Sequence, residues 1–297
     1  MTELQPLLTR IDALLDRLEP WLPAGSPAGD WSAPAWRWRR QGTGGWLEPI
    51  HRPHRLRLAD LRCVDRQRDE LDRNTRQFLA GRSANNVLLW GSRGTGKSSL
   101  IKALLTAYHD RGLRLIEVDK EDLIHLPDIL RMIDGRPERF ILYCDDLSFE
   151  AGELGYKALK AALDGSLQAA PENLLIYATS NRRHLLPEYQ HENREARAVD
   201  GEIHQGEGVE EKISLSDRFG LWLSFYPFSQ EQYLDVVHHW LEWLGARNSD
   251  REAIDRAALQ WALRRGSRSG RTAWQFARDW AGRLDIPPSP LVSNPLI

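Results

Sequence analysis

Two kinds of hydrophobic and polar pattern alternate along the 297-residue chain. Short apolar runs are separated by segments with apolar residues at intervals of three and four, which predicts strands separated by helices. The expected strands cover about residues 87–90, 113–118, 139–144, 173–179 and 221–226, and the expected intervening helices cover about 97–109, 122–133 and 153–164. This order is typical of an α/β fold with a parallel sheet, in which ligands bind at the carboxyl ends of the strands.

The rest of the chain predicts further elements. An amphipathic helix is expected over residues 3–19, and another helix leads from Leu58 to about Gly81. The segment between them is rich in Pro and Gly and holds five of the twelve tryptophans, so we expect it to be irregular and held by its aromatic side chains. Residues 187–212 are too hydrophilic for a core and predict a loop or mobile insertion. Helices are expected near the C-terminus over about 229–244, 251–264 and 270–284.

These patterns divide the chain into successive units. A length of 297 residues accommodates two domains at the usual size of ~100–200 residues each. We expect an N-terminal extension with an amphipathic helix and a Trp- and Pro-rich part, an α/β domain, a helical unit and a Pro-rich tail. The expected bounds are 1–57, 58–227, 228–286 and 287–297.

Composition and charge limit the partners and the location. The net charge of −2, from 40 basic and 42 acidic residues, provides no general attraction for nucleic acid or an anionic membrane. Cys63 and Cys144 are far apart and have no neighbouring Cys or clustered His, so no disulfide framework or zinc site is indicated. No segment approaches the ~20 apolar residues of a membrane span, and no signal peptide is recognisable. We therefore expect a cytosolic protein with no membrane partner.

A glycine-rich sequence between the first expected strand and its helix carries the strongest chemical signal. It matches the phosphate-loop pattern G-x-x-x-x-G-K-[ST], whose glycines let backbone N–H groups point at phosphate. Lys97 would neutralise the β- and γ-phosphates, and Ser98 would offer a hydroxyl to Mg²⁺. The alternative is a glycine turn that happens to precede Lys-Ser. The expected nucleoside triphosphate site comprises Gly91, Ser92, Arg93, Gly94, Thr95, Gly96, Lys97, Ser98 and Ser99.

Two carboxylates follow the third expected strand. Asp145 and Asp146 come directly after an apolar run, at the strand end that would lie beside the phosphate loop. A carboxylate there can hold Mg²⁺, and a second can orient or deprotonate the attacking water. We therefore assign Asp145 to the metal and Asp146 to the water, with a solvated Asp-Asp turn as the alternative.

Three more polar residues are candidates for contact with the nucleotide. Asn181 follows the next strand, and its amide can hydrogen-bond the γ-phosphate and the attacking water, although Asn is also common in turns. Arg218 precedes the last strand and can reach the nucleotide of a neighbouring subunit, with a surface ion pair to Asp217 as the alternative. Arg271 begins the last expected helix, where it either contacts phosphate or is solvated.

The order of these residues resembles that of an AAA+ ATPase over about residues 58–284. The resemblance implies an ATP-binding α/β domain with a parallel five-stranded sheet in the order 5-1-4-3-2, followed by a helical lid. It also implies conventional motif roles, with Walker A at Gly91–Ser98, Walker B at Phe140–Asp146, sensor 1 at Asn181, the arginine finger at Arg218 and sensor 2 at Arg271. The motif sequences are similar to those of a bacterial AAA+ family known only as a domain of unknown function.

Two positions depart from the usual AAA+ pattern. Walker B ends in Asp-Asp rather than Asp-Glu, which resembles replication initiators and helicase loaders, and the short arm of Asp146 predicts slow hydrolysis. Residues 61–64 occupy the place of the adenine-side segment, and Cys63 stands where the family usually has Gly. Because of this departure, the sequence assigns no adenine contact to the segment.

The resemblance implies a homo-oligomer that hydrolyses Mg-ATP to ADP and phosphate to remodel or load an unknown client, with Arg218 acting in trans and Arg271 in cis. The alternative is a nucleotide-gated switch or adaptor with little turnover. Asn181 and Arg218 argue against a third reading, a P-loop kinase. The segment after the second strand lacks an aromatic-apolar-Gly pore loop, which disfavours a threading unfoldase.

Nucleic acid is a second candidate partner. Arg37, Arg39 and Arg40 alternate with Trp36 and Trp38, and such a cluster can contact phosphates and bases. The alternatives are packing within the domain or a protein partner. No helix-turn-helix pattern follows the lid, so sequence-specific DNA binding is unsupported.

Overall fold

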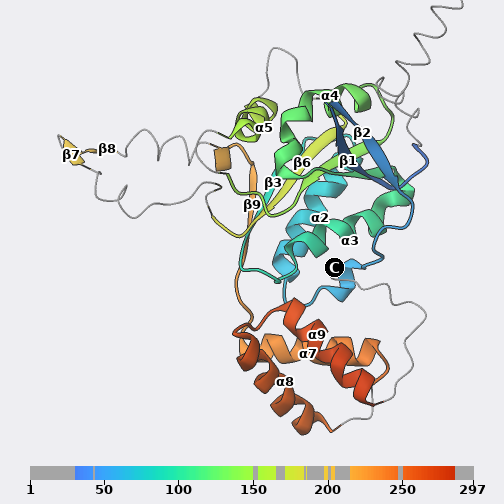
Figure 1. Ribbon diagram of the computed structural model, residues 1–297, viewed down its shortest axis with the longest axis vertical. Coiled ribbons are helices and arrows are strands. Elements are labelled where there is room, and N and C mark those ends of the chain that lie inside the picture. Colours follow the sequence, from blue (N-terminus) through green and yellow to red (C-terminus); the bar gives the residue numbers. More distant parts are fainter. Residues whose placement is uncertain are drawn as a thin grey trace, which may run out of the picture.

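The computed structural model shows an α/β domain that rests on a smaller helical unit (Figure 1). It describes residues 31–284 apart from 43, 150–152, 165–170, 184, 186–196, 200–201, 205–214 and 247–249. The helix expected over residues 3–19, most of the polar insertion and the Pro-rich tail lie outside the described residues. None of the described helices is long and apolar enough to cross a membrane.

The α/β domain is built on a sheet of seven strands, which corrects the expected number of five. Its parallel strands are β3 (Val87–Gly91), β4 (Leu113–Glu117), β5 (Arg139–Cys144), β6 (Leu174–Ser180) and β9 (Leu221–Phe225). They lie in the order β9-β3-β6-β5-β4, which is 5-1-4-3-2 when these five are counted along the chain. The carboxyl ends of β3, β5 and β6 are therefore neighbours, as the candidate site requires.

The two additional strands come from the segment predicted to be irregular. β1 (Ala35–Gln41) pairs in parallel with β4, and β2 (Gly44–Ile50) pairs antiparallel with β1. Trp36 and Trp38 are buried in a hydrophobic core against the sheet, with exposed fractions of 0% and 1%. The prediction of an irregular segment was wrong, because it was based on the Pro and Gly content. The alternation of Trp and Arg with a period of two, which is a strand signal, was not used.

Helices cover both faces of the sheet (Figure 1). On one face lie α2 (Asp65–Leu79) and α3 (Lys97–Tyr108), and on the other lie α4 (Leu126–Ile133) and α5 (Leu154–Asp164). The strands divide their side chains between two cores, so that Tyr143 of β5 packs on the α3 side while Leu142 packs on the α4 side. The central strands are consequently apolar on both faces, which is why they appear in the sequence as continuous apolar runs.

Short elements connect these layers. η1 (Leu58–Asp60) precedes α2, η2 (His109–Arg111) follows α3, and η3 (Lys120–His125) forms the first part of the helix expected over residues 122–133. Pro127 lies in the first turn of α4, where its missing N–H costs no intrahelical bond. Within the polar insertion the structure describes one antiparallel pair, β7 (Arg197–Val199) and β8 (Glu202–His204).

Three capped helices form the unit below the α/β domain, which we call the lid. They are α7 (Gln230–Trp243), α8 (Arg251–Arg265) and α9 (Gly270–Arg283). The side chains of Ser229 and Ser269 accept hydrogen bonds from the first turns of α7 and α9, and thereby fix where these helices begin. Trp240 of α7 packs on Trp274 of α9 with ring centroids 4.9 Å apart. The lid core is continuous with the core around α2 and α3.

Candidate functional site

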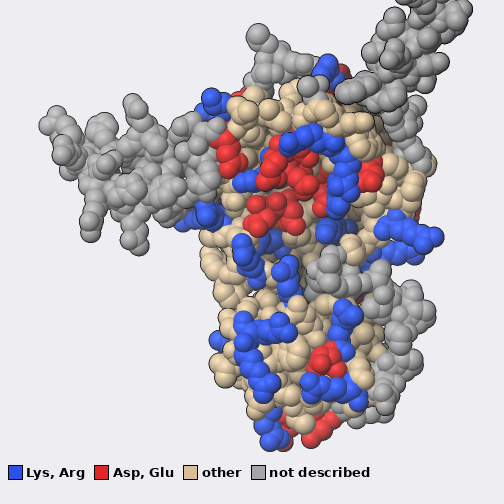
Figure 2. Space-filling view, viewed as in Figure 1, with Lys and Arg blue, Asp and Glu red and all other residues tan. Residues whose placement is uncertain are grey.

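A cavity of about 520 Å³ lies between the carboxyl ends of the parallel strands and the lid. Its volume is in the range of small-molecule sites. Basic side chains outnumber acidic ones among its described lining residues, with Arg62, Arg93, Lys97, Lys102 and Arg271 against Asp60, Asp145 and Asp146. Figure 2 shows acidic side chains gathered on the α/β domain and basic side chains between them and the lid. The cavity is therefore suited to an anionic ligand, and a cation bound with that ligand could lie against the acidic lining residues.

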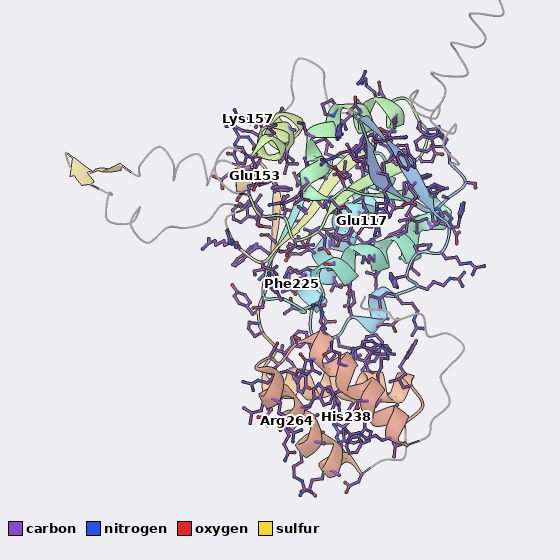
Figure 3. All side chains as sticks on the ribbon, in the orientation of Figure 1. Glu117, Glu153, Lys157, Phe225, His238 and Arg264 are labelled. Atoms are coloured by element: carbon purple, nitrogen blue, oxygen red, sulfur yellow. The ribbon has the colours of Figure 1, made fainter. Side chains whose placement is uncertain are left out.

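The loop after β3 forms one wall of the cavity, and its path depends on glycine. Gly91 has a φ of 127°, and a Cβ there would lie 2.0 Å from the carbonyl oxygen of Phe225 on β9. Figure 3 labels Phe225 at the end of β9 that points toward the lid. Gly94 has a φ of 74° and touches the lid, because the backbone N–H of Arg271 donates to its carbonyl oxygen at 3.2 Å. Glycine thus permits both the turn of the loop and the contact with the lid.

Lys97 is held at the floor of the loop. Its Nζ donates to the carbonyl oxygens of Gly91 at 2.7 Å and Ser92 at 2.8 Å, and lies 3.3 Å from Oδ1 of Asn181. Burial lowers the pKa of Lys97 to about 8, although Asp145 and Asp146 act in the opposite direction. The structure therefore brings Asn181 to the phosphate loop, as its place after β6 predicts.

Ser98 and Asp145 form an oxygen-rich pair beside Lys97. Asp145 Oδ1 accepts hydrogen bonds of 2.6 Å from the hydroxyls of Ser98 and Thr179. Burial alone would raise the pKa of Asp145, but the hydrogen bonds from Ser98 and Thr179 help to outweigh it and the pKa is lowered, so the group is a carboxylate. Hydroxyl and carboxylate oxygens suit Mg²⁺, which keeps most of its other ligands as phosphate and water. No cluster of three His, Cys, Asp or Glu that could cage a metal occurs in the described part of the chain.

Asp146 is held in a left-handed backbone conformation, with a φ of 50°. Its N–H donates to the Thr179 hydroxyl at 2.9 Å, and its carboxylate accepts a hydrogen bond from the Asn181 amide. Asp tolerates this conformation better than most residues, and such strained positions are frequent at functional sites. The carboxylate lines the cavity and is half exposed, so it can reach a water molecule there.

The opposite end of the cavity is apolar. Leu61 and Val64 from the segment before α2 face Phe228, Val236 and Trp240 from the lid. All five side chains are buried, so they form a slot suited to a flat aromatic group. The resemblance places residues 61–64 on the adenine side without assigning contacts to them. The sequence did not indicate the apolar lid residues, because nothing local distinguishes them from other apolar positions of a helix.

Two further cavity residues were also missed. Thr179, whose hydroxyl bonds both Asp145 and the backbone of Asp146, lies two residues before Asn181 at the end of β6. Lys102 lies four residues after Ser98 on α3, so the helical period places it on the same helix face. That spacing could have identified Lys102 from the sequence.

Comparison with known proteins identifies the family of this chain. A family model described as "Protein of unknown function (DUF815)" matches residues 31–284. The chain belongs to the DUF815 family. No curated protein matches it.

Solved structures show the fold of this DUF815 member to be that of AAA+ proteins. A Thermotoga maritima RuvB structure, titled a Holliday junction branch migration motor, aligns with a TM-score of 0.51 and 14% identity over 82% of this chain and 70% of RuvB. The FIGL-1 AAA domain in complex with ADP aligns with a TM-score of 0.50 and 17% identity over 79% of this chain and 76% of that domain. The predicted resemblance to AAA+ proteins is therefore confirmed for family and fold.

The two candidate arginines occupy different places. Arg271 lines the cavity at the start of α9. Arg218 is not among the described lining residues, and its guanidinium pairs with Asp164 at the end of α5. Arg218 thus has Asp164 as an intramolecular ion-pair partner, where the expected alternative named Asp217.

The arginines proposed to contact nucleic acid form ion pairs within this DUF815 domain. Each arginine forms an ion pair: Arg37 with Glu117 at 2.6 Å, Arg39 with Glu48 at 2.7 Å and Arg40 with Asp122 at 2.7 Å. Trp36 and Trp38 are both buried and cannot stack on bases. The packing alternative accounts for this cluster.

Proposed function

We propose that this DUF815 chain is an ATPase that binds Mg-ATP between the α/β domain and the lid and hydrolyses it to ADP and phosphate. One observation carries the proposal: the polar side chains at the phosphate loop form one set of contacts, connected through Thr179. They are Lys97, Ser98, Asp145, Asp146 and Asn181. An apolar slot for a base lies at the other end of the same cavity. An AAA+ fold with such a site favours a nucleoside triphosphate over other anions.

Each polar residue has a role in this proposal. Lys97 turns from the carbonyl oxygens of the loop to the β- and γ-phosphates. Ser98 and Asp145 would hold Mg²⁺, which would supply positive charge beside the phosphate oxygens. Asp146 accepts a proton from the attacking water, which Asn181 helps to orient.

The hydrolysis step then balances. The water oxygen bonds to the γ-phosphorus as the bond from that phosphorus to the β–γ bridging oxygen breaks. The electron pair of the broken bond stays on the bridging oxygen of the departing ADP. The water proton resides on Asp146 and passes to solvent after phosphate leaves.

We further propose that Arg218 acts in trans in a homo-oligomer, while Arg271 acts in cis from the lid. Arg218 does not line the cavity of its own chain, whereas Arg271 does. The contact with Asp164 holds Arg218 at the end of α5, where an assembling neighbour can meet it. Remodelling or loading of a client and a cytosolic location stay predictions from the sequence.

ATP turnover against protein concentration tests this proposal, with wild type beside Arg218→Ala and molecular mass determined in the same ATP-containing samples. We expect turnover per subunit to rise as oligomers form, and Arg218→Ala to keep ATP binding but lose turnover by ~10³-fold or more. The matched control is Asp217→Ala, which removes the neighbouring exposed charge. Normal hydrolysis by Arg218→Ala would exclude the trans role.

A nucleotide-gated switch with little turnover is the second candidate. The observation that supports a switch is that the carboxylate of Asp146, which would activate water, already contacts Asn181 and Arg93. A monomer that binds ATP and shows flat, negligible turnover at every concentration would support this function instead. The search would then move to proteins bound differently by the ATP and ADP forms.

A further inference from the structure

We propose that Arg93 is a further catalytic residue, which contacts the γ-phosphate of ATP from within the same chain. This inference rests on the proposed ATPase function and assigns a role to a loop position that the phosphate-loop pattern leaves open to any residue. Arg93 lines the cavity, and its Nη2 lies 3.9 Å from Oδ2 of Asp146. The guanidinium therefore lies beside the carboxylate assigned to the attacking water.

The contact between Arg93 and Asp146 is weak enough to be exchanged for phosphate. Their side chains are 79% and 58% exposed, and the separation of 3.9 Å exceeds that of a charge-assisted hydrogen bond. An exposed pair of this kind contributes little to stability, so moving the guanidinium to a nearby phosphate oxygen costs little. Without nucleotide, Arg93 would partly neutralise Asp146. With ATP bound, it would meet a group of higher charge.

The chemistry of the site favours a guanidinium at this position. Lys97 lies at the floor of the loop, where backbone carbonyls hold it. Arg93 extends from the rim of the same loop toward the side where water must approach the γ-phosphorus, because Asp146 is on that side. An arginine stays protonated at all working pH values, and its planar fork can bind two phosphate oxygens. Charge on the γ-phosphate oxygens is what such a group stabilises during transfer.

Arg93 and Arg218 would contribute to catalysis in different oligomeric states. Arg218 reaches a nucleotide only in an assembly, whereas Arg93 is present at its own site in every oligomeric state. We therefore expect the slow turnover of unassembled protein to depend on Arg93. The increase on assembly would depend on Arg218.

The experiment compares Arg93→Ala and Arg93→Lys with wild type. Arg73→Ala is the matched control, because Arg73 is an exposed arginine of α2 outside the cavity lining. Phosphate release gives kcat and KM, and calorimetry gives the affinities for Mg-ADP and for a non-hydrolysable Mg-ATP analogue. We expect Arg93→Ala to lower kcat by about 100-fold. We also expect it to reduce the preference for the triphosphate over ADP by about tenfold, with partial recovery in Arg93→Lys.

Each outcome decides the proposal. If Arg93→Ala keeps the wild-type kcat and triphosphate preference, or weakens both nucleotides equally at unchanged kcat, a γ-phosphate role for Arg93 is wrong. The ATPase function then still stands, provided that wild type hydrolyses ATP and Lys97→Ala does not bind it tightly. If wild type itself binds neither nucleotide, both proposals are overturned. Because the side chains of Arg93 and Arg73 are exposed, the variants at these two positions should unfold at the wild-type temperature, which circular dichroism checks.

Discussion

The ammonium of Lys97 lies in a buried position against two backbone carbonyl oxygens, and burial lowers its pKa to about 8. Below that pH the lysine is charged before the nucleotide arrives. Above it, binding of the triphosphate must also protonate the amine, which weakens the net affinity. We expect the affinity for Mg-ATP to fall as the pH rises through 8, by at most about tenfold per pH unit. Calorimetry across this range in buffers of different ionisation enthalpy would detect the accompanying proton uptake.

The control for this titration is Lys97→Ala. This variant should lose tight ATP binding at every pH, because the loop then lacks its buried positive charge. The weak binding that remains should show no change of affinity near pH 8. A wild-type affinity that stays constant from neutral pH to well above 8 would contradict the depressed pKa.

At the scale of elements, the hairpin of β1 and β2 is an integral part of the sheet. Trp36 is fully buried, and its ring packs 6.2 Å from that of Phe140 on β5. Replacing it by Ala removes a large side chain from a packed core, so we expect Trp36→Ala to lower the free energy of unfolding by about 3–5 kcal/mol. Urea denaturation followed by circular dichroism measures this change.

Arg39→Ala is the matched variant on the same strand. The Arg39–Glu48 pair is exposed on both sides, so its loss should cost less than about 1 kcal/mol. Similar small losses in both variants would mean that the hairpin contributes little to the stability of the domain. A large loss only in Trp36→Ala would show that the Trp residues serve the core.

At the scale of the whole molecule, the cavity joins two units that the sequence presents as separate. The phosphate loop belongs to the α/β domain, whereas Trp240 and Arg271 belong to the lid. A ligand that contacts both units stabilises both, by about 2.7 kcal/mol when its concentration is 100 times its Kd. We expect Mg-ATP to raise the unfolding temperature and to slow hydrogen exchange in α3, α7 and α9 together.

Removal of Mg²⁺ with a chelator should reduce this stabilisation, because the carboxylate of Asp145 would then face phosphate without a cation between them. Lys97→Ala should show neither effect. Protection confined to α3 and the phosphate loop would mean that the lid does not close on the nucleotide.

The sequence by itself determined the features that depend on local pattern. Apolar runs and helical periods located the central parallel strands and the lid helices to within a few residues, since burial on both faces requires such runs. The phosphate loop was equally local, because its glycines, Lys97 and Ser98 form one continuous motif. The proximity of Asp145 and Asn181 to this loop followed from the rule that parallel strands end at one edge.

Tertiary structure alone decided the other long-range contacts. Nothing near Trp36 in the sequence indicates that β1 would pair with β4 and extend the sheet to seven strands. The apolar slot needs Leu61 and Trp240 on opposite sides of one cavity, and Arg218 meets Asp164 across 54 residues. The contact of Arg93 with Asp146 likewise joins two loops. Such pairings depend on how separate elements pack, and periodicity along the chain carries no information about them.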